Sequence, residues 1–127
     1  MTGRPHASPA NADERRKRLQ RGRWSELLAA AALMAKGYRI IGRNVKTRAG
    51  EIDIIAVRGN LLAFVEVKRR PTQEAAEAAV GGRQAQRIRN AADYWLARRP
   101  RYHHHEQRFD LVLLVPRRWP RHIPDGL

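Results

Sequence analysis

The sequence of 127 residues contains no cysteine. Disulfide bonds and thiolate metal sites are therefore excluded, and the composition fits a reducing cytosol. Long apolar runs are lacking too. None approaches the roughly 20 residues that a membrane-spanning helix needs, and the N-terminal segment has no apolar run that could serve as a signal peptide. We therefore expect a soluble cytoplasmic protein with no membrane partner.

Acidic residues are also scarce. The 12 Asp and Glu residues stand against 26 Lys and Arg, which gives a formal net charge of +14. Lysine supplies only 4 of the basic residues and arginine supplies 22. Because the planar guanidinium binds phosphate through two parallel hydrogen bonds, this bias favours a polyanionic partner such as nucleic acid. A genome rich in arginine codons explains the same bias, and that alternative stays open.

The length favours one domain with a core of its own. Residues 1–12 are rich in Pro, Ala and small polar types and are predicted to form a mobile tail, so that the domain spans 13–127. A basic run at 15–23 leads into apolar residues at helical spacing. Their predicted apolar face consists of Trp24, Leu27, Leu28, Ala31 and Met34 or Ala35. Gly37 is expected to end this first helix.

The remaining pattern alternates strands and helices. Strands are predicted at 38–45, 51–57, 61–68 and 108–116, a second helix at 83–99, a loop at 71–82 and an irregular tail at 117–127. The second helix carries an apolar face of Ile88, Ala91, Ala92, Trp95 and Leu96, and the last strand is expected to be covered on both faces. The order helix–three strands–helix–strand predicts an α/β fold with a mixed sheet flanked by helices.

Three carboxylates interrupt the otherwise apolar strands of the stretch GEIDIIAVRGNLLAFVEVKRR, residues 50–70. Strand periodicity places Glu51 and Asp53 on one face, opposite Ile52, Ile54 and Ala56. It places Glu66 and Lys68 on one face together with Leu62 and Phe64. Because residues 58–60 are predicted to close an antiparallel hairpin that pairs positions near 57 with positions near 62, Asp53 should lie beside Glu66.

Adjacent carboxylates repel each other unless a cation lies between them. Oxygen ligands without His or Cys favour Mg²⁺ or Mn²⁺. The ammonium group of Lys68, two residues beyond Glu66, can orient a water or neutralise developing charge. This combination is typical of phosphodiester hydrolysis. The alternative is a structural salt bridge on a solvated sheet face.

The same residues carry a resemblance to a known family. The matching stretches are Gly22-x-x-x-Glu26, GY at 37–38, RN at 43–44, GEIDII at 50–55, FVEVKRR at 64–70 and RFD at 108–110. Together they resemble the PD-(D/E)xK (restriction endonuclease-like) nuclease superfamily and, more specifically, the uncharacterised YraN-like family of small bacterial proteins. The arrangement is also similar to archaeal Holliday-junction resolvases.

The resemblance implies roles for individual residues. Asp53 and Glu66 would bind the metal together with the Val67 carbonyl, Lys68 would be the catalytic lysine, and Glu26 would complete the acidic cluster. A simple ion pair of Glu26 with Arg23, three residues earlier, is the alternative for this position. Glu51 has no assigned role.

Residues flanking this predicted site are expected to contact nucleic acid. They are Arg23, Arg69, Arg70, Arg83, Gln84 and Arg87. Gln84 stands where YraN-like chains usually have a lysine, so the electrostatic role of that position is in doubt, although Arg83 and Arg87 could substitute for it. Resolvase-like enzymes act as dimers, which by analogy implies a homodimer.

Other conspicuous side chains have simpler expected roles. His103, His104 and His105 are expected in an exposed loop rather than in a metal site. Trp95 is expected in the core, and Trp119 against the sheet edge in preference to stacking on a nucleobase. The sequence thus predicts a nuclease dependent on Mg²⁺ or Mn²⁺ that acts on branched or structured DNA. A non-catalytic nucleic-acid-binding protein and a protein-interaction role are the alternatives.

Overall fold

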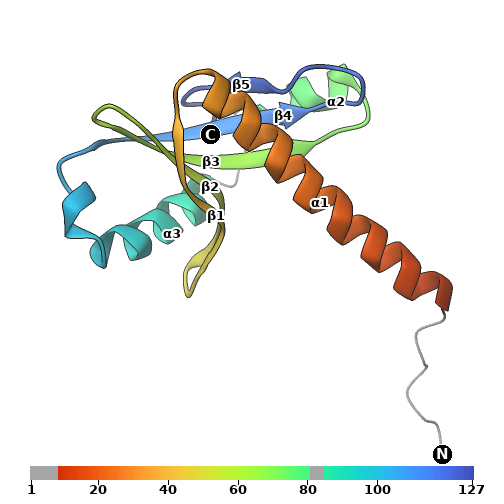
Figure 1. Ribbon diagram of the computed structural model, residues 1–127, viewed down its shortest axis with the longest axis horizontal. Coiled ribbons are helices and arrows are strands. Elements are labelled where there is room, and N and C mark those ends of the chain that lie inside the picture. Colours follow the sequence, from red (N-terminus) through yellow and green to blue (C-terminus); the bar gives the residue numbers. More distant parts are fainter. Residues whose placement is uncertain (1–8, 81–84) are drawn as a thin grey trace, which may run out of the picture.

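The computed structural model describes residues 9–80 and 85–127. Over these residues the chain forms one mixed sheet flanked by helices (Figure 1). The elements in chain order are α1 (Pro9–Ala35), β1 (Arg39–Thr47), β2 (Gly50–Arg58), β3 (Leu61–Arg69), α2 (Gln73–Ala78), α3 (Ala85–Ala97), the short 3-10 helix η1 (Pro100–Tyr102), β4 (Glu106–Leu114) and β5 (Arg121–Ile123). The strands lie side by side in that order; β3 and β4 run parallel and the other neighbours antiparallel. The predicted α/β class is confirmed.

Helices cover both faces of the sheet and divide its core into two main clusters. α1 packs Ala29, Ala30 and Leu33 against one face, where they meet residues such as Ile54 and Val65. α3 packs against the other face, and its predicted apolar residues are all buried there. Because every residue from Phe109 to Leu114 is buried, β4 is covered on both faces as predicted.

The apolar face predicted for the first helix is wrong. Trp24 is 65% exposed, Leu28 49% and Met34 55%, whereas Leu33 is fully buried. The side chains of α1 that are buried are Ser25, Ala29, Ala30, Ala32 and Leu33. The stretch from 27 to 35 is apolar on all sides, so periodicity cannot select a face. The small alanines decide it, because they allow the helix to lie close to the sheet.

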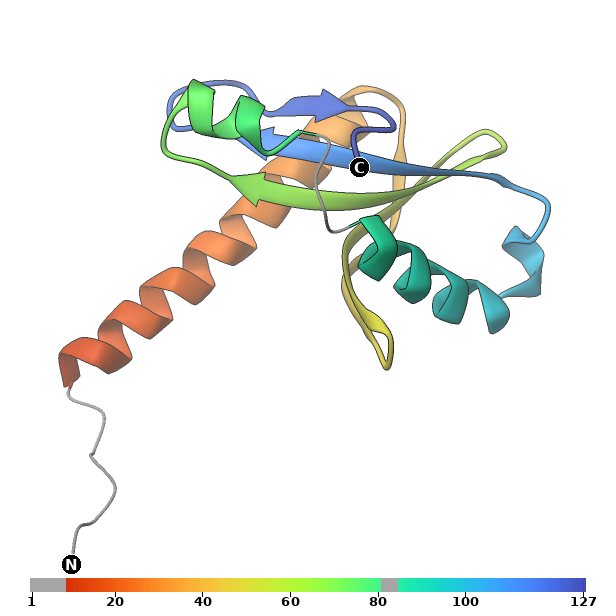
Figure 2. The same ribbon diagram turned by 180° about the vertical axis from the view of Figure 1, so that it is seen from behind.

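The N-terminal part of α1 extends away from the sheet as a free-standing helix (Figure 2). The helix includes residues 9–12, which the sequence pattern assigns to the tail. Every side chain from residue 12 to residue 24 is exposed. At its other end the helix ends at Ala35, and Gly37 forms the terminating turn as predicted: its φ is 89°, and the Tyr38 N–H donates to the Leu33 carbonyl at 3.1 Å.

Two further elements correct the sequence prediction. The predicted loop at 71–82 contains α2, whose first turn is capped by Thr72: its Oγ1 accepts a hydrogen bond from the Ala75 N–H at 3.1 Å. The predicted irregular tail contains β5, which pairs with β4 from Leu113↔Arg121 to Leu111↔Ile123. The prolines at 120 and 124 flank this strand rather than interrupt it, which is why the pairing is allowed.

Candidate active site at the fork between β2 and β3

The candidate site lies where two paired strands separate. β2 and β3 form the predicted antiparallel hairpin, and Val57 opposes Leu62 as expected. Their pairing ends at Ile54↔Val65, so Asp53 is the first residue of β2 beyond the paired region. The Val67 N–H donates a hydrogen bond to Asp53 Oδ2 at 2.8 Å. The Asp53 side chain thus binds a main-chain amide of β3 just past the point where the ladder ends.

The separation of the strands also corrects one predicted orientation. Ile54 and Ala56 pack on the α1 side of the sheet, as periodicity requires, but Ile52 packs on the α3 side with Ile55 and Val57. Beyond Ile54, β2 pairs only with β1, and a two-stranded ribbon twists more strongly than a wider sheet. Asp53 lies between Ile52 and Ile54, which pack on opposite faces of the sheet.

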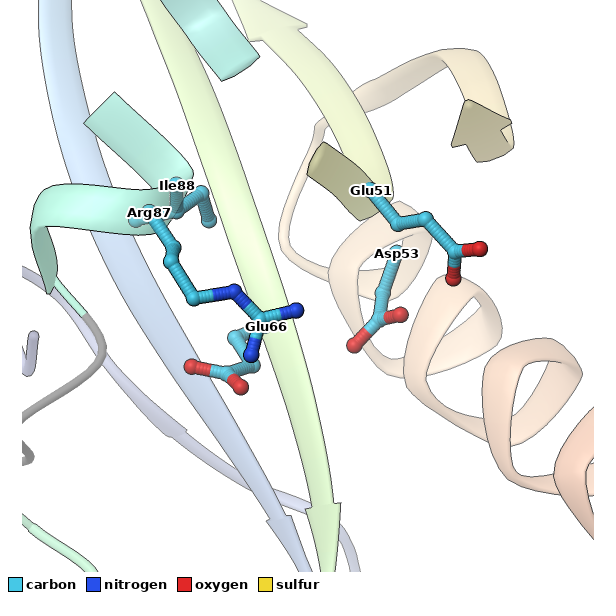
Figure 3. A pocket seen from close by; sticks show the side chains of 5 residues that line it. All are labelled: Glu51, Asp53, Glu66, Arg87 and Ile88. Atoms are coloured by element: carbon cyan, nitrogen blue, oxygen red, sulfur yellow. The ribbon is translucent and has the colours of Figure 1, made fainter. Parts of the chain in front are cut away.

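A cavity of about 190 Å³ opens at this fork. It is lined by Glu51, Asp53, Glu66, Arg87 and Ile88 (Figure 3). The two strands supply the three carboxylates, and α3 supplies the guanidinium group, which extends toward the Glu66 side of the cavity. The predicted proximity of Asp53 and Glu66 is therefore confirmed, and Glu51 joins them although the sequence pattern assigned it no role.

Asp53 and Glu26 hold their protons more tightly than ordinary carboxyl groups do, because the pKa of each is raised. Burial raises the pKa of Asp53, the hydrogen bond from Val67 lowers it, and the charges of Glu66 and Glu51 raise it further. Burial and the charge of Asp53 raise the pKa of Glu26, which Arg43 lowers. Glu26 lies on α1 and does not line the cavity, yet it belongs to the same electrostatic cluster. Burial and the negative charge of neighbouring carboxylates thus act together on Asp53 and Glu26.

Glu66 presents an atom that lacks a partner. Its Oε2 is buried and accepts no hydrogen bond from the described residues. Within 9–80 and 85–127, no three His, Asp or Glu side chains are grouped closely enough to hold a metal ion. Mg²⁺ is nevertheless commonly held by only one or two carboxylates, with water and substrate phosphate completing its shell. The pair Asp53 and Glu66 therefore fits a hard divalent cation, and the Val67 carbonyl as a further ligand stays a prediction.

The structural salt bridge considered from the sequence is not formed. Among the described residues no ion pair joins Lys68 to Asp53 or Glu66, and none joins Glu26 to Arg23. Lys68 is half-buried and lies two residues beyond Glu66 on β3, on the same face but outside the cavity lining. Its predicted catalytic role would require it to reach a phosphate held at the mouth of the cavity.

The predicted nucleic-acid contacts are distributed around this site. Arg87 lines the cavity itself, Arg69 is exposed at the end of β3, and Arg23 is exposed on α1. Arg70 is half-buried and its Nη1 donates to the Arg69 carbonyl at 2.7 Å. Arg83 and Gln84 lie outside the described residues. The histidine run is a turn after η1, where His103 and His104 are exposed and His103 Nε2 contacts the Leu96 carbonyl at 2.6 Å.

Sequence reasoning missed a second buried carboxylate. Asp110 on β4 is completely buried and accepts hydrogen bonds from Arg108 Nε at 2.7 Å and Nη2 at 2.6 Å. His122 Nε2 donates to it at 2.8 Å, and the Asp125 N–H donates at 2.9 Å. Burial raises the pKa of Asp110, but the hydrogen bonds from His122 and Arg108 lower it to about 2. The acid in the RFD stretch could have indicated this residue from the sequence. The donors that surround Asp110 indicate a structural role.

Comparison with known proteins agrees with the resemblance at the level of the family. The profile of "Uncharacterised protein family UPF0102" matches residues 25–114. A UPF0102 protein of Maricaulis maris is 52% identical over 108 residues, which cover 85% of each chain, and one of Brucella canis is 52% identical over 104 residues, 82% of each. A UPF0102 protein of Mesorhizobium japonicum is 50% identical over 126 residues, 99% of this chain and 96% of its own. In the described part of the chain no helix has the length and apolar character needed to cross a membrane. The chain belongs to the UPF0102 family, of which the YraN-like proteins are members.

Proposed function

We propose that this protein is a nuclease that depends on Mg²⁺ or Mn²⁺, hydrolyses phosphodiester bonds and acts on branched or structured DNA. The observation that carries the proposal is the convergence of Asp53 and Glu66 in one cavity at the fork between β2 and β3, with a buried Glu66 oxygen that lacks a partner. The excess of basic residues elsewhere in the chain supplies the attraction for a polyanionic substrate.

Each residue of the site has a proposed part. Asp53 and Glu66 hold the cation, and Glu26 adds negative charge that strengthens its binding. A bound divalent cation polarises the scissile phosphate and lowers the pKa of water. Lys68 orients the attacking water or neutralises charge on the phosphate, and Arg87 positions the phosphate from the opposite wall of the cavity. The predicted order helix–three strands–helix–strand, with α2 and β5 added to it, supports the proposal through the resemblance to restriction endonuclease-like nucleases.

A second candidate function is nucleic-acid binding without catalysis on the same fold. Two observations favour it: no group of three potential ligands is assembled among the described residues, and a neutral glutamine stands at position 84. In that case the acids at the fork would have no divalent cation to bind. Fold alone does not decide between the two functions, because one fold supports many activities.

The deciding experiment measures cleavage of labelled single-stranded, duplex, flapped and four-way-junction DNA in Mg²⁺, in Mn²⁺ and in EDTA. Wild type is compared with Asp53→Asn and Glu66→Gln, which remove charge and preserve shape. The matched control is Glu74→Gln, the same loss of charge at an exposed position on α2. We expect metal-dependent cleavage that falls at least about 100-fold in the two site variants and stays unchanged in the control. Salt-sensitive binding without cleavage in any metal establishes the binding function instead.

A further inference from the structure

We propose that the groove between α1 and the β4–β5 connection binds unpaired nucleobases of a single strand, which stack on Trp24 and Trp119. These two tryptophans are 65% and 76% exposed, whereas Trp95 in the core is only 5% exposed. Large aromatic side chains left in solvent mark binding surfaces when they gather in one place. Trp24 on α1 and Trp119 after β4 come from distant parts of the chain and line the same groove.

The groove has the size and lining of a ligand site. Its volume is about 350 Å³, within the range of roughly 300–1,000 Å³ that is usual for small-molecule pockets. Leu28, Val115 and Pro120 contribute apolar surface beside the two indoles. A planar, weakly polar group of the size of a nucleobase therefore finds both aromatic faces and apolar walls here.

The charge around the groove indicates a polyanion as its occupant. Arg21, Arg69, Arg117 and Arg118 line it, and no acidic residue does so in the described part of the chain. Sites that bind single-stranded nucleic acid commonly combine arginine with exposed aromatic side chains. The guanidinium groups bind phosphates, and the rings stack on bases. A second copy of this chain would bring a like charge of +14 to the same rim, which disfavours a homodimer at this surface.

Trp119 also borders a second hollow. A cavity of about 440 Å³ between β5 and α2 shares Val115, Arg118, Trp119 and Pro120 with the groove. The indole therefore stands between two adjacent hollows. A strand that runs from one to the other passes over Trp119, and successive bases can occupy either side of it. This arrangement favours a run of unpaired nucleotides over a single flipped base.

One strand contributes a residue to each place: on β3, Glu66 lines the candidate active site and Arg69 lines the groove. Arg69, which lines the groove, follows Lys68 directly and lies three residues beyond Glu66. The inference rests on the proposed function in one respect: the strand held in the groove would be the one presented for cleavage. It narrows the substrate to DNA with an unpaired segment next to the scissile phosphate, such as a flap or an open junction.

The test is binding rather than cleavage, and it is performed in EDTA on the full chain. Fluorescence anisotropy measures the affinity for a labelled single strand and for an abasic strand of equal length, which keeps the phosphates and lacks the bases. Trp24→Ala and Trp119→Ala are compared with wild type and with Met34→Ala. Met34 is the control because it is 55% exposed on the same helix and does not line the groove.

We expect each tryptophan variant to bind the single strand roughly 5- to 140-fold more weakly, as stacking of ~1–3 kcal/mol per base predicts. On the abasic strand the variants should match wild type, and Met34→Ala should match it on both strands. The inference is overturned if the tryptophan variants bind the single strand as wild type does, or if they lose equal affinity on the abasic strand. It is also overturned if Trp24→Ala only converts a dimer to a monomer in sedimentation.

These outcomes are separate from those of the cleavage assay. Because EDTA removes divalent cations, loss of base-dependent binding refutes the groove and leaves the metal-dependent activity to be judged independently. Conversely, a protein that never cleaves DNA but binds single strands through both tryptophans refutes the nuclease and retains the groove.

Discussion

Replacement of Asp110 by Asn should destabilise the protein strongly and leave its proposed chemistry intact. Asp110 is fully buried and accepts four hydrogen bonds, three of which come from the side chains of Arg108 and His122. Asparagine has the same shape as aspartate, but an NH₂ group replaces one carboxylate oxygen. This NH₂ group must then face hydrogen-bond donors and cannot accept from them. Arg108 then remains partly buried, with a charge that nothing nearby neutralises.

The magnitude follows from this loss of charge. Removal of one partner from a buried ion pair costs about 3–5 kcal/mol, a large part of the ~5–15 kcal/mol that stabilises a typical domain. For a chain of 127 residues this corresponds to a fall in Tm of roughly 10–20 °C. Asp93→Asn is the matched control, because Asp93 is exposed on α3 and the same substitution there should change stability by less than ~0.5 kcal/mol.

Thermal and guanidinium unfolding, followed by circular dichroism, measure the effect. If Asp110→Asn does not fold, Tyr38→Phe provides a milder test, since it removes only the hydroxyl that accepts a hydrogen bond from Arg108 and should cost about 1 kcal/mol. At a temperature where Asp110→Asn is folded, its DNA cleavage should equal that of wild type. A Tm within about 3 °C of wild type refutes the structural role, and so does loss of cleavage in the folded variant if wild type cleaves DNA.

The lowered pKa of Asp110 also predicts that the stability of the fold depends on pH. Because its pKa is lowered from 3.8 to about 2 in the folded protein, ionised Asp110 stabilises the fold above pH 4. This contribution, on the order of 2 kcal/mol at 1.36 kcal/mol per pKa unit, is lost as the pH falls from about 4 to about 2. The Tm of wild type should therefore fall over this range more steeply than that of Asp110→Asn.

Two further predictions concern α1 and the fork. Leu33→Ala should lower the free energy of unfolding by about 2–5 kcal/mol, because Leu33 is fully buried. Leu27→Ala should lower it by less than ~1 kcal/mol, because Leu27 is 44% exposed. Equal effects of the two substitutions in chemical unfolding would contradict the observed packing of α1. Asp53→Asn should raise the Tm at pH 7 in EDTA. The pKa of Asp53 is raised above 3.8 in the folded protein, so its ionised carboxylate destabilises the fold at a pH above that raised pKa. Addition of Mg²⁺ should raise the Tm of wild type more than that of Asp53→Asn, and a Tm lowered by this substitution would contradict the electrostatic interpretation.

The sequence predicts the central part of the fold well because the signals there are local. The turn at 58–60 sets the register of the hairpin, and Val57 opposes Leu62 as expected. The alternation of side chains along β3 then places Leu62 and Phe64 on one side and Ala63 and Val65 on the other. The hairpin register therefore predicts that Asp53 lies near Glu66, although periodicity misplaces Ile52 beside it.

The errors occur where tertiary contacts override the pattern. α1 exposes Trp24 and Leu28 because its flank of small alanines fits closer to the sheet than its bulkier flank, and no period in the sequence conveys that fit. β5 pairs with β4 in a segment with several prolines, and there His122 of β5 binds Asp110 of β4. Such contacts join residues that are distant in sequence, and a reading of single segments does not find them.

The half-buried Asp53 and the fully buried Asp110 show how acids in one sheet can differ in role. Asp53 and Asp110 both interrupt apolar strands, although the sequence pattern draws attention only to Asp53. Asp110 is surrounded by donors, and its lowered pKa reflects a charge that the fold has already neutralised. Asp53 receives one amide hydrogen bond, and its pKa is raised by burial first and then by the charges of Glu66 and Glu51. An acid such as Asp110, which already has its donors, gains nothing from a cation. An acid such as Asp53, which lies among other carboxylates, would be stabilised by one. For this reason the proposed chemistry is assigned to the fork and not to the more deeply buried aspartate.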